Sequence, residues 1–179
     1  MKYTLYSSAG HYNKDSGAIG VNGRKESIEA IDFRDLVNKE LKRLGKNVVQ
    51  DNDNDTLGQY LSKINPTDGD VVVEFHFNAF NGKATGTEVL IPNDANKRSK
   101  DMAKELVDGY ARIMGIPNRG VKTESQSARG RLGLMRKKGA VCLPEICFID
   151  NPKDMGAYDR NKVNLACFTA QVMAKYDFN

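Results

Sequence analysis

Residues 70–78 have the sequence DVVVEFHFN and form the clearest predicted β-strand of the chain. Their valine and aromatic side chains favour strand structure. Two polar residues, Glu74 and His76, interrupt the apolar run close to its carboxyl end. In open α/β sheets, ligands and catalytic groups gather at the carboxyl ends of the strands, so we predict that His76 belongs to a functional site.

Predicted strands and helices alternate on both sides of this segment, which indicates an α/β layered domain. A helix over residues 25–44 is predicted by apolar residues at spacings of three and four, and Gly45 ends it. Residues 9–23 are rich in glycine, asparagine and aspartate and form a predicted functional loop. The other predicted helices cover residues 55–64, 97–114 and 155–175, and the predicted strands cover residues 2–8, 47–50, 70–78, 86–91, 131–135 and 140–147.

The chain of 179 residues is long enough for one domain with a sizeable core. No apolar run approaches the roughly 20 residues that span a bilayer, so membrane insertion is not predicted. The first ten residues lack the apolar stretch of a signal peptide, and we therefore expect synthesis and folding in the cytoplasm. The oligomeric state is not predicted by the sequence.

The formal net charge of +4 favours an anionic partner, and both nucleic acids and the acidic polymers of a bacterial wall are of that kind. The basic residues are scattered in short pairs such as Lys97-Arg98 and Lys137-Lys138. A nucleic-acid binder needs a clustered basic face with stacking aromatic residues, and the sequence shows neither clearly. We therefore predict no nucleic-acid partner.

His11 and His76 are the only histidines of the chain. His11 lies just after the first predicted strand, and His76 lies at the end of the strand over residues 70–78. Two histidines at the carboxyl ends of two strands can share one metal ion. A hydrolytic zinc site needs three protein ligands and one open position for water, and two histidines with one carboxylate meet that need.

Glu26 is the predicted third ligand, because it follows the His11 loop at the start of the first long helix. Glu29, one turn later, is the nearest competitor. Glu74 lies two residues before His76 and on the same face of its strand, so it is a further alternative. An ordinary role as a first-turn acid of the helix also stays open for Glu26 at this point.

A separate carboxylate is needed to take a proton from the metal-bound water and return it to the leaving amine. Glu145 is the best candidate, because it is an acid within the apolar run of residues 141–148, VCLPEICF. Such a position is costly without a functional or ionic partner. An ion pair with Arg131 or Arg136 is the structural alternative.

Four segments resemble, in the right order, the motifs of the zinc-dependent N-acetylmuramoyl-L-alanine amidases of the type-3 class. Tyr12, Asn13 and Cys147 depart from the family pattern, since the family usually has glycines there. The matching segments are residues 9–20 for the first motif, 23–26 for the second, 74–79 with 86–89 for the third and 143–152 for the fourth.

The resemblance implies a mixed β-sheet of about six strands flanked by helices on both faces. It implies that residues 1–179 are an amidase catalytic domain, with no separate wall-binding domain visible. It further implies Zn²⁺ held by His11, Glu26 and His76, with Glu145 as the catalytic base and acid. The substrate would be peptidoglycan, cut between N-acetylmuramic acid and L-alanine. Asn78 and Arg136 are candidate substrate contacts.

The short chain without a signal peptide is similar to a phage or prophage endolysin, which acts on the cell wall after release or lysis. Two other functions stay open from the sequence. One is a zinc peptidase that acts on another amide. The other is a non-catalytic peptidoglycan-binding or phage structural module that keeps the same fold.

Overall fold

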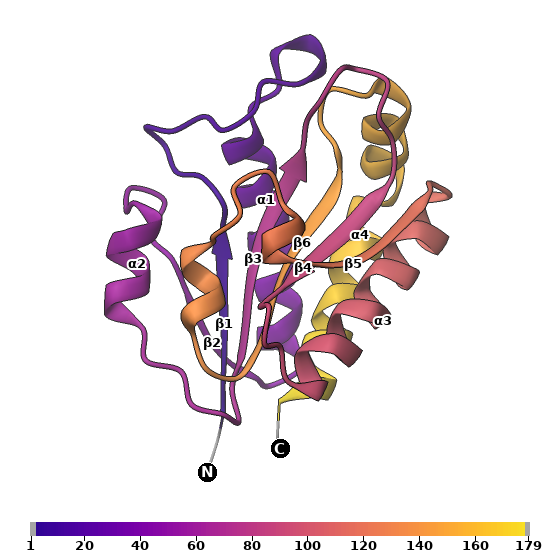
Figure 1. Ribbon diagram of the computed structural model, residues 1–179. Coiled ribbons are helices and arrows are strands. Elements are labelled where there is room, and N and C mark those ends of the chain that lie inside the picture. Colours follow the sequence, from indigo (N-terminus) through magenta and orange to yellow (C-terminus); the bar gives the residue numbers. More distant parts are fainter. Residues whose placement is uncertain (1–2, 178–179) are drawn as a thin grey trace.

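Six strands form one mixed sheet within residues 3–177, the part of the chain that the computed structural model describes (Figure 1). Their order across the sheet is β2-β1-β3-β6-β4-β5. The neighbours β2, β1, β3 and β6 are parallel, β4 is antiparallel to β6, and β5 is parallel to β4. The strands are β1 (Thr4–Ala9), β2 (Asn47–Gln50), β3 (Val71–Asn78), β4 (Thr87–Ile91), β5 (Asn118–Thr123) and β6 (Ala140–Phe148).

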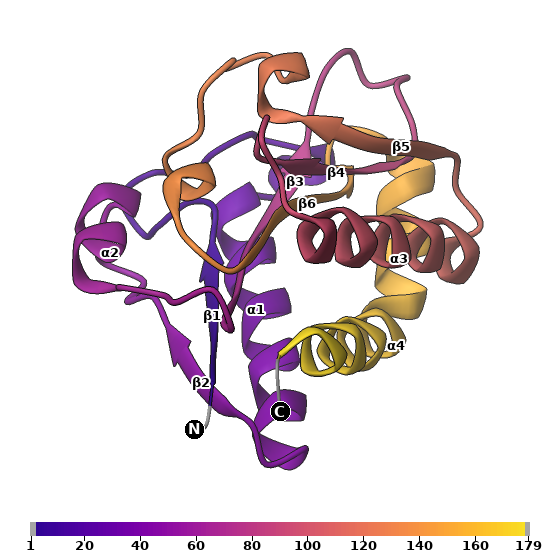
Figure 2. The same ribbon diagram turned by 60° about the horizontal axis from the view of Figure 1, so that its bottom comes forward.

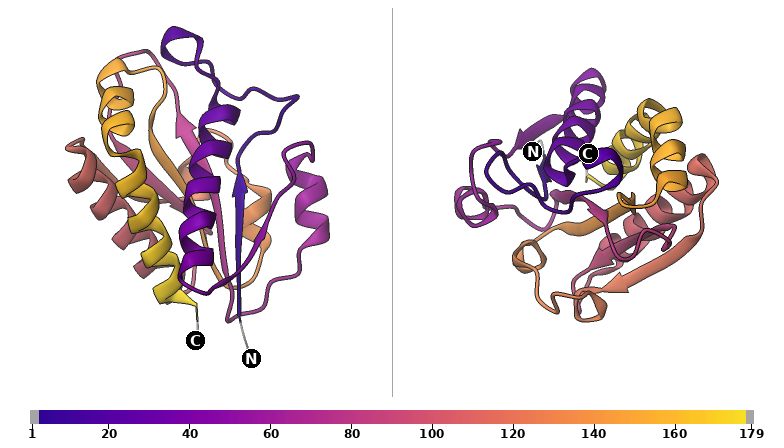
Figure 3. Two further views of the ribbon diagram at one scale, coloured as in Figure 1. Left: turned by 180° about the vertical axis from the view of Figure 1, so that it is seen from behind. Right: turned by 90° about the horizontal axis from the view of Figure 1, so that it is seen from above.

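Helices lie on both faces of this sheet, but unequally. Figure 3 (left) shows α1 and α4 in front of the sheet, and α3 lies on the same side, as Figure 2 also shows. The short α2 and a 3-10 helix lie on the opposite face, the near side in Figure 1. None of the helices within residues 3–177 is long and apolar enough to cross a membrane. The bounds are α1 (Glu26–Arg43), α2 (Leu57–Lys63), α3 (Lys97–Met114), α4 (Pro152–Tyr176) and the 3-10 helix Gly133–Arg136.

The predicted α/β domain, with a mixed sheet of about six strands and helices on both faces, is confirmed. The predicted start of the first strand at Lys2 lies outside the described residues. The last helix begins at Pro152, three residues earlier than predicted. Asn151 caps it, because its side chain accepts hydrogen bonds from the N–H groups of Lys153 and Asp154.

The predicted strand over residues 131–135 is wrong. Residues Gly133–Arg136 form the 3-10 helix, and Leu134 and Met135 are buried in the smaller core on the α2 side. The sixth strand is β5, which the sequence did not indicate. β5 is an edge strand with Val121 as its one aliphatic residue and with Gly120 at a φ of 84°. It therefore lacks the apolar alternation by which strands are predicted.

Side-chain alternation along β3 separates the main core from the other face of the sheet. Val73, Phe75 and Phe77 point toward α1 and α4 and are buried in the main core. The residues between them, including Glu74 and His76, therefore lie on the α2 side. β3 is central and all its residues from Val71 to Phe77 are buried, so these two polar side chains occupy a sheltered position.

A fully buried arginine of α1 holds the carboxyl end of β1. Arg34 Nη1 donates to Asp51 Oδ1 at 2.6 Å, and Asp51 Oδ2 accepts from the backbone N–H of Ala9 at 3.3 Å. Arg34 also pairs with Asp53 at 2.8 Å, and the Asp53 carbonyl accepts from the N–H of Asn13 at 2.8 Å. This network therefore fixes the start of the loop that contains His11.

We expect Arg34→Met to lower the free energy of unfolding by about 3–5 kcal/mol, because it leaves the Asp51 carboxylate buried without its cation. Urea denaturation measures this loss. Adding Asp51→Asn to Arg34→Met should restore part of the stability, since the unpaired charge is then removed. Arg43→Met is the control, because the exposed Arg43 pairs with Glu40 at the surface and solvent screens such pairs. Equal stability of Arg34→Met and Arg43→Met would contradict the role of the buried pair.

Candidate metal centre

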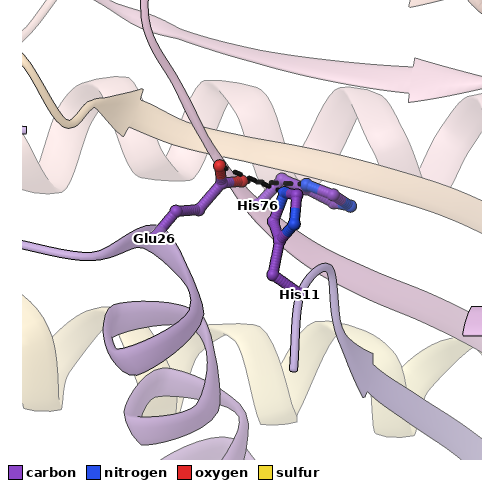
Figure 4. A group of neighbouring side chains, drawn as sticks. All are labelled: His11, Glu26 and His76. Atoms are coloured by element: carbon purple, nitrogen blue, oxygen red, sulfur yellow. Dashed lines mark hydrogen bonds and ion pairs between the residues drawn. The ribbon is translucent and has the colours of Figure 1, made fainter. Parts of the chain in front are cut away.

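His11, Glu26 and His76 meet at the carboxyl edge of β1 and β3 (Figure 4). His11 Nε2 lies 3.2 Å from Glu26 Oε2, and His76 Nδ1 lies 2.9 Å from Glu26 Oε1. All three side chains are buried, and one donor atom from each lies within 4.8 Å of the other two. Two imidazole nitrogens and a carboxylate at this spacing are the donor set that proteins use for a tetrahedral divalent ion with one open position.

Each of the three side chains comes from a different element. His11 lies two residues beyond β1, His76 lies in β3 on the α2 side of the sheet, and Glu26 is the first residue of α1. Both carboxylate oxygens of Glu26 also accept backbone hydrogen bonds, from the N–H of Ala18 at 2.9 Å and from the N–H of Phe77 at 3.1 Å. The carboxylate is therefore fixed between the two rings.

Glycines let the backbone of the His11 loop come into direct contact with these side chains. A Cβ atom on Gly10 would lie 2.0 Å from His76 Cε1. A Cβ on Gly17 would lie 2.5 Å from His11 Cδ2 and 2.7 Å from Glu26 Oε2. The loop thus encloses the three donor groups without room for larger residues.

The remaining ring nitrogen of each histidine faces a further carboxylate. His11 Nδ1 lies 2.8 Å from Asp15 Oδ2, and His76 Nε2 lies 3.0 Å from Glu74 Oε1. A carboxylate on the far ring nitrogen fixes the tautomer and orientation of histidines that bind metals. The sequence did not single out Asp15, although its spacing of four from His11 was visible.

Contacts within the cluster shift the pKa values of its members in opposite directions. Burial would raise the pKa of Glu26, but hydrogen bonds with His11 and His76 lower it below its usual range. Burial would lower the pKa of His76, but hydrogen bonds with Glu26 and Glu74 raise it well above its usual value. A metal ion binds the neutral ring, so binding would release protons from these histidines.

The structure separates the alternatives for the third donor. Glu29 pairs with Arg24, whose Nε donates to Glu29 Oε1 at 2.8 Å, and Glu29 is not part of the group of His11, Glu26 and His76. Glu74 contacts the outer nitrogen of His76 and also accepts from Ser8 Oγ at 3.3 Å. Glu26 alone among these three acids lies between both rings.

Glu145 lies on β6 directly opposite His76 in the parallel register. Its Oε2 atom is buried and has no hydrogen-bond partner among residues 3–177. Burial raises the pKa of Glu145 to about 7. The predicted structural alternative is not observed, since Arg136 pairs with Glu124 at 2.8 Å and the described residues show no ion pair for Glu145.

A cleft of about 730 Å³ opens over this group and is lined by His11, Glu26, His76 and Glu145. Of the two candidate substrate contacts, Asn78 lines the cleft and Arg136 does not. Beyond the predicted residues, the cleft wall includes Glu88, Arg119, Arg129 and the exposed Phe80. Glu88 lies within the third motif segment but was not singled out, and Phe80, Arg119 and Arg129 lie outside all four motif segments. Their approach to the cleft depends on how β4, β5 and two loops are arranged.

We expect Gly17→Ala to weaken metal binding at least tenfold, because the added methyl group would displace His11 and Glu26. Competition with a chromophoric chelator measures the affinity. Gly45→Ala is a matched control, since Gly45 has a φ of 73°, close to the 61° of Gly17, but a Cβ there would meet nothing within 4 Å. Equal metal affinity of the two variants would show that Gly17 does not shape the site.

We expect Glu145→Gln to raise the free energy of unfolding of the metal-free protein by about 1–2 kcal/mol at pH 8, because a neutral amide replaces a buried charge. The pKa of Glu145 in the folded protein is raised to about 7, so its ionised form destabilises the fold, and this effect is complete above pH 7. The destabilisation disappears below the ordinary pKa of glutamate. Urea denaturation should therefore show the gain at pH 8 and a smaller one at pH 5, and an equal gain at both values would contradict the raised pKa.

Comparison with known proteins gives one family match, to the model described as N-acetylmuramoyl-L-alanine amidase, over residues 8–173. The chain is 31% identical over 123 residues to the uncharacterized protein YqiI of Bacillus subtilis. The aligned region covers 66% of this chain and 59% of YqiI. The chain is also 30% identical over 156 residues to the N-acetylmuramoyl-L-alanine amidase LytC of Bacillus subtilis. That aligned region covers 84% of this chain and 30% of LytC.

Among solved structures, the fold is similar to the catalytic domain of CwlV, an N-acetylmuramoyl-L-alanine amidase from Bacillus (Paenibacillus) polymyxa. The TM-score is 0.73 at 25% identity, and the match covers 97% of this chain and 94% of that chain. The chain spans less than two thirds of the length of the two curated relatives. The family match includes all four site residues, and the chain belongs to the N-acetylmuramoyl-L-alanine amidase family.

Proposed function

We propose that this chain is a zinc-dependent hydrolase that cuts the amide bond between N-acetylmuramic acid and L-alanine in peptidoglycan. The observation that supports this most is the position of Glu145 beside the group of His11, Glu26 and His76, on one wall of an open cleft. The family to which the chain belongs supports the same substrate.

The donor set fits zinc. His11 Nε2, His76 Nδ1 and a carboxylate oxygen of Glu26 would hold the ion, with Asp15 and Glu74 behind the two rings. When bound, zinc would supply Lewis-acid activation of the amide carbonyl and of the attacking water.

Glu145 is the proposed catalytic base and acid. Its pKa of about 7 places its protonation equilibrium near neutral pH, where a group can both accept and return a proton. Oε2, which has no partner among the described residues, would take the proton from the attacking water. The same atom would then give the proton to the amide nitrogen that leaves as the amino terminus of L-alanine.

The test is incubation of the purified protein with peptidoglycan, followed by quantification of newly exposed amino-terminal L-alanine. We expect release that stops with a chelator, returns on addition of Zn²⁺ and falls by at least about a hundredfold in Glu145→Gln. Glu40→Gln, on the surface of α1 where Glu40 pairs with Arg43, should retain full activity.

Other results would favour the alternatives. New amino termini of other residues would indicate a zinc peptidase that acts on a different amide. Binding of the protein to the wall without any release, despite bound zinc, would indicate a non-catalytic module. The endolysin role and action on the wall after lysis stay predictions. They would be tested by measuring lysis of bacteria when the protein is added to the medium and when it is produced inside the cells.

A further inference from the structure

Two arginines line the cleft, and their surroundings differ. Arg119 Nε donates to Glu88 Oε2 at 2.7 Å, and its guanidinium lies 5.0 Å from the centre of the Phe148 ring. The exposed guanidinium of Arg129 has no hydrogen-bond or ion-pair partner among residues 3–177. Glu88 is shared with Lys122, whose Nζ lies 2.6 Å from the same oxygen, and Arg129 is the one of these two arginines without an ion pair among residues 3–177.

The loop that contains Arg129 is held in place by a buried acid. Glu124 is fully buried, and its Oε2 accepts from the N–H of Leu132 at 3.0 Å and from Arg136 Nη2 at 2.9 Å. The loop also turns on itself, because the N–H of Gly130 donates to the Ser127 carbonyl at 3.2 Å. Figure 1 shows this segment in orange on the near side of the sheet. These hydrogen bonds fix the loop from which the Arg129 side chain extends.

The acids nearest to Arg129 have other partners or roles. Asp15 and Glu145 are close enough to interact electrostatically with its guanidinium, but neither forms an ion pair with it. Asp15 is bound to His11, and Glu145 faces the metal group. The guanidinium of Arg129 is exposed, so a substrate carboxylate could replace its hydration water with charge-assisted hydrogen bonds.

A guanidinium has the geometry to bind a carboxylate through two parallel N–H···O bonds. On the peptide side of the scissile amide, the second residue of the stem is a glutamate whose α-group is either a carboxylate or a carboxamide. We propose that Arg129 binds this carboxylate and makes the enzyme selective for stems with the free acid. The inference rests on the proposed amidase function and names its substrate class.

The experiment compares two peptidoglycan preparations that differ in this group, one with glutamate and one with isoglutamine in the stem. Initial rates of L-alanine release at limiting substrate give kcat/KM for each. We expect the wild type to prefer the acid about tenfold or more, because a hydrogen bond to a charged group is worth that factor. In Arg129→Gln the preference should disappear, mainly through slower turnover of the acid form.

Arg131→Gln is the matched control, because Arg131 is an exposed arginine two residues further along that does not line the cleft. It removes the same charge and should keep the preference. If Arg129→Gln lowered kcat/KM equally for both peptidoglycan preparations, the proposal would be overturned. Arg129 would then act at the reacting centre or in general attraction of the protein to peptidoglycan. Wild-type release without any preference would also overturn it, while leaving the amidase function intact. No release from either wall would overturn the proposed function itself.

Discussion

The alternation of side chains along β3 is the constraint on which the rest of the molecule depends. Because β3 is central and buried, its two faces must satisfy different surroundings. One face is apolar and packs against α1 and α4, with the Phe33 and Phe75 rings 5.2 Å apart. The other face places Glu74 and His76 beside the carboxyl ends of β1 and β6. The strand that builds the core therefore also brings the polar group to the cleft.

Burial of so many charges has a cost that the structure offsets unevenly. Asp15, His11, Glu26, His76 and Glu74 follow one another in a single chain of polar contacts, with Glu26 at its centre. Glu145 is the exception within this site, since its buried oxygen has no hydrogen-bond partner among the described residues. Groups that carry out proton transfer need such a perturbed environment, so the least satisfied acid of the site is the one best suited to that role.

Much of this arrangement could be predicted from the sequence, and the errors have physical reasons. The strand over residues 70–78 and the helix over 97–114 lie within a residue of their observed bounds, because their patterns are strong. The juxtaposition of His11 and His76 follows from the rule for strand ends. β5 and Arg129 could not be predicted in this way. Their positions depend on a register with β4 and on the contact between Glu124 and Arg136, which are set by tertiary packing.

The loops that form the walls of the cleft are held by other contacts than the residues of its floor, His11, Glu26, His76 and Glu145. One wall is the loop before β4, where Asp150 Oδ2 accepts from the N–H of Phe80 at 3.0 Å and Asp154 Oδ2 accepts from the N–H of Gly86 at 2.9 Å. The opposite wall is the loop held by Glu124. The first wall is thus held by the partly buried Asp150 and the buried Asp154, and the second by the buried Glu124. Residues such as Phe80 and Arg129 can therefore change, and with them the preferred substrate, while the sheet keeps the proposed metal and catalytic groups in register.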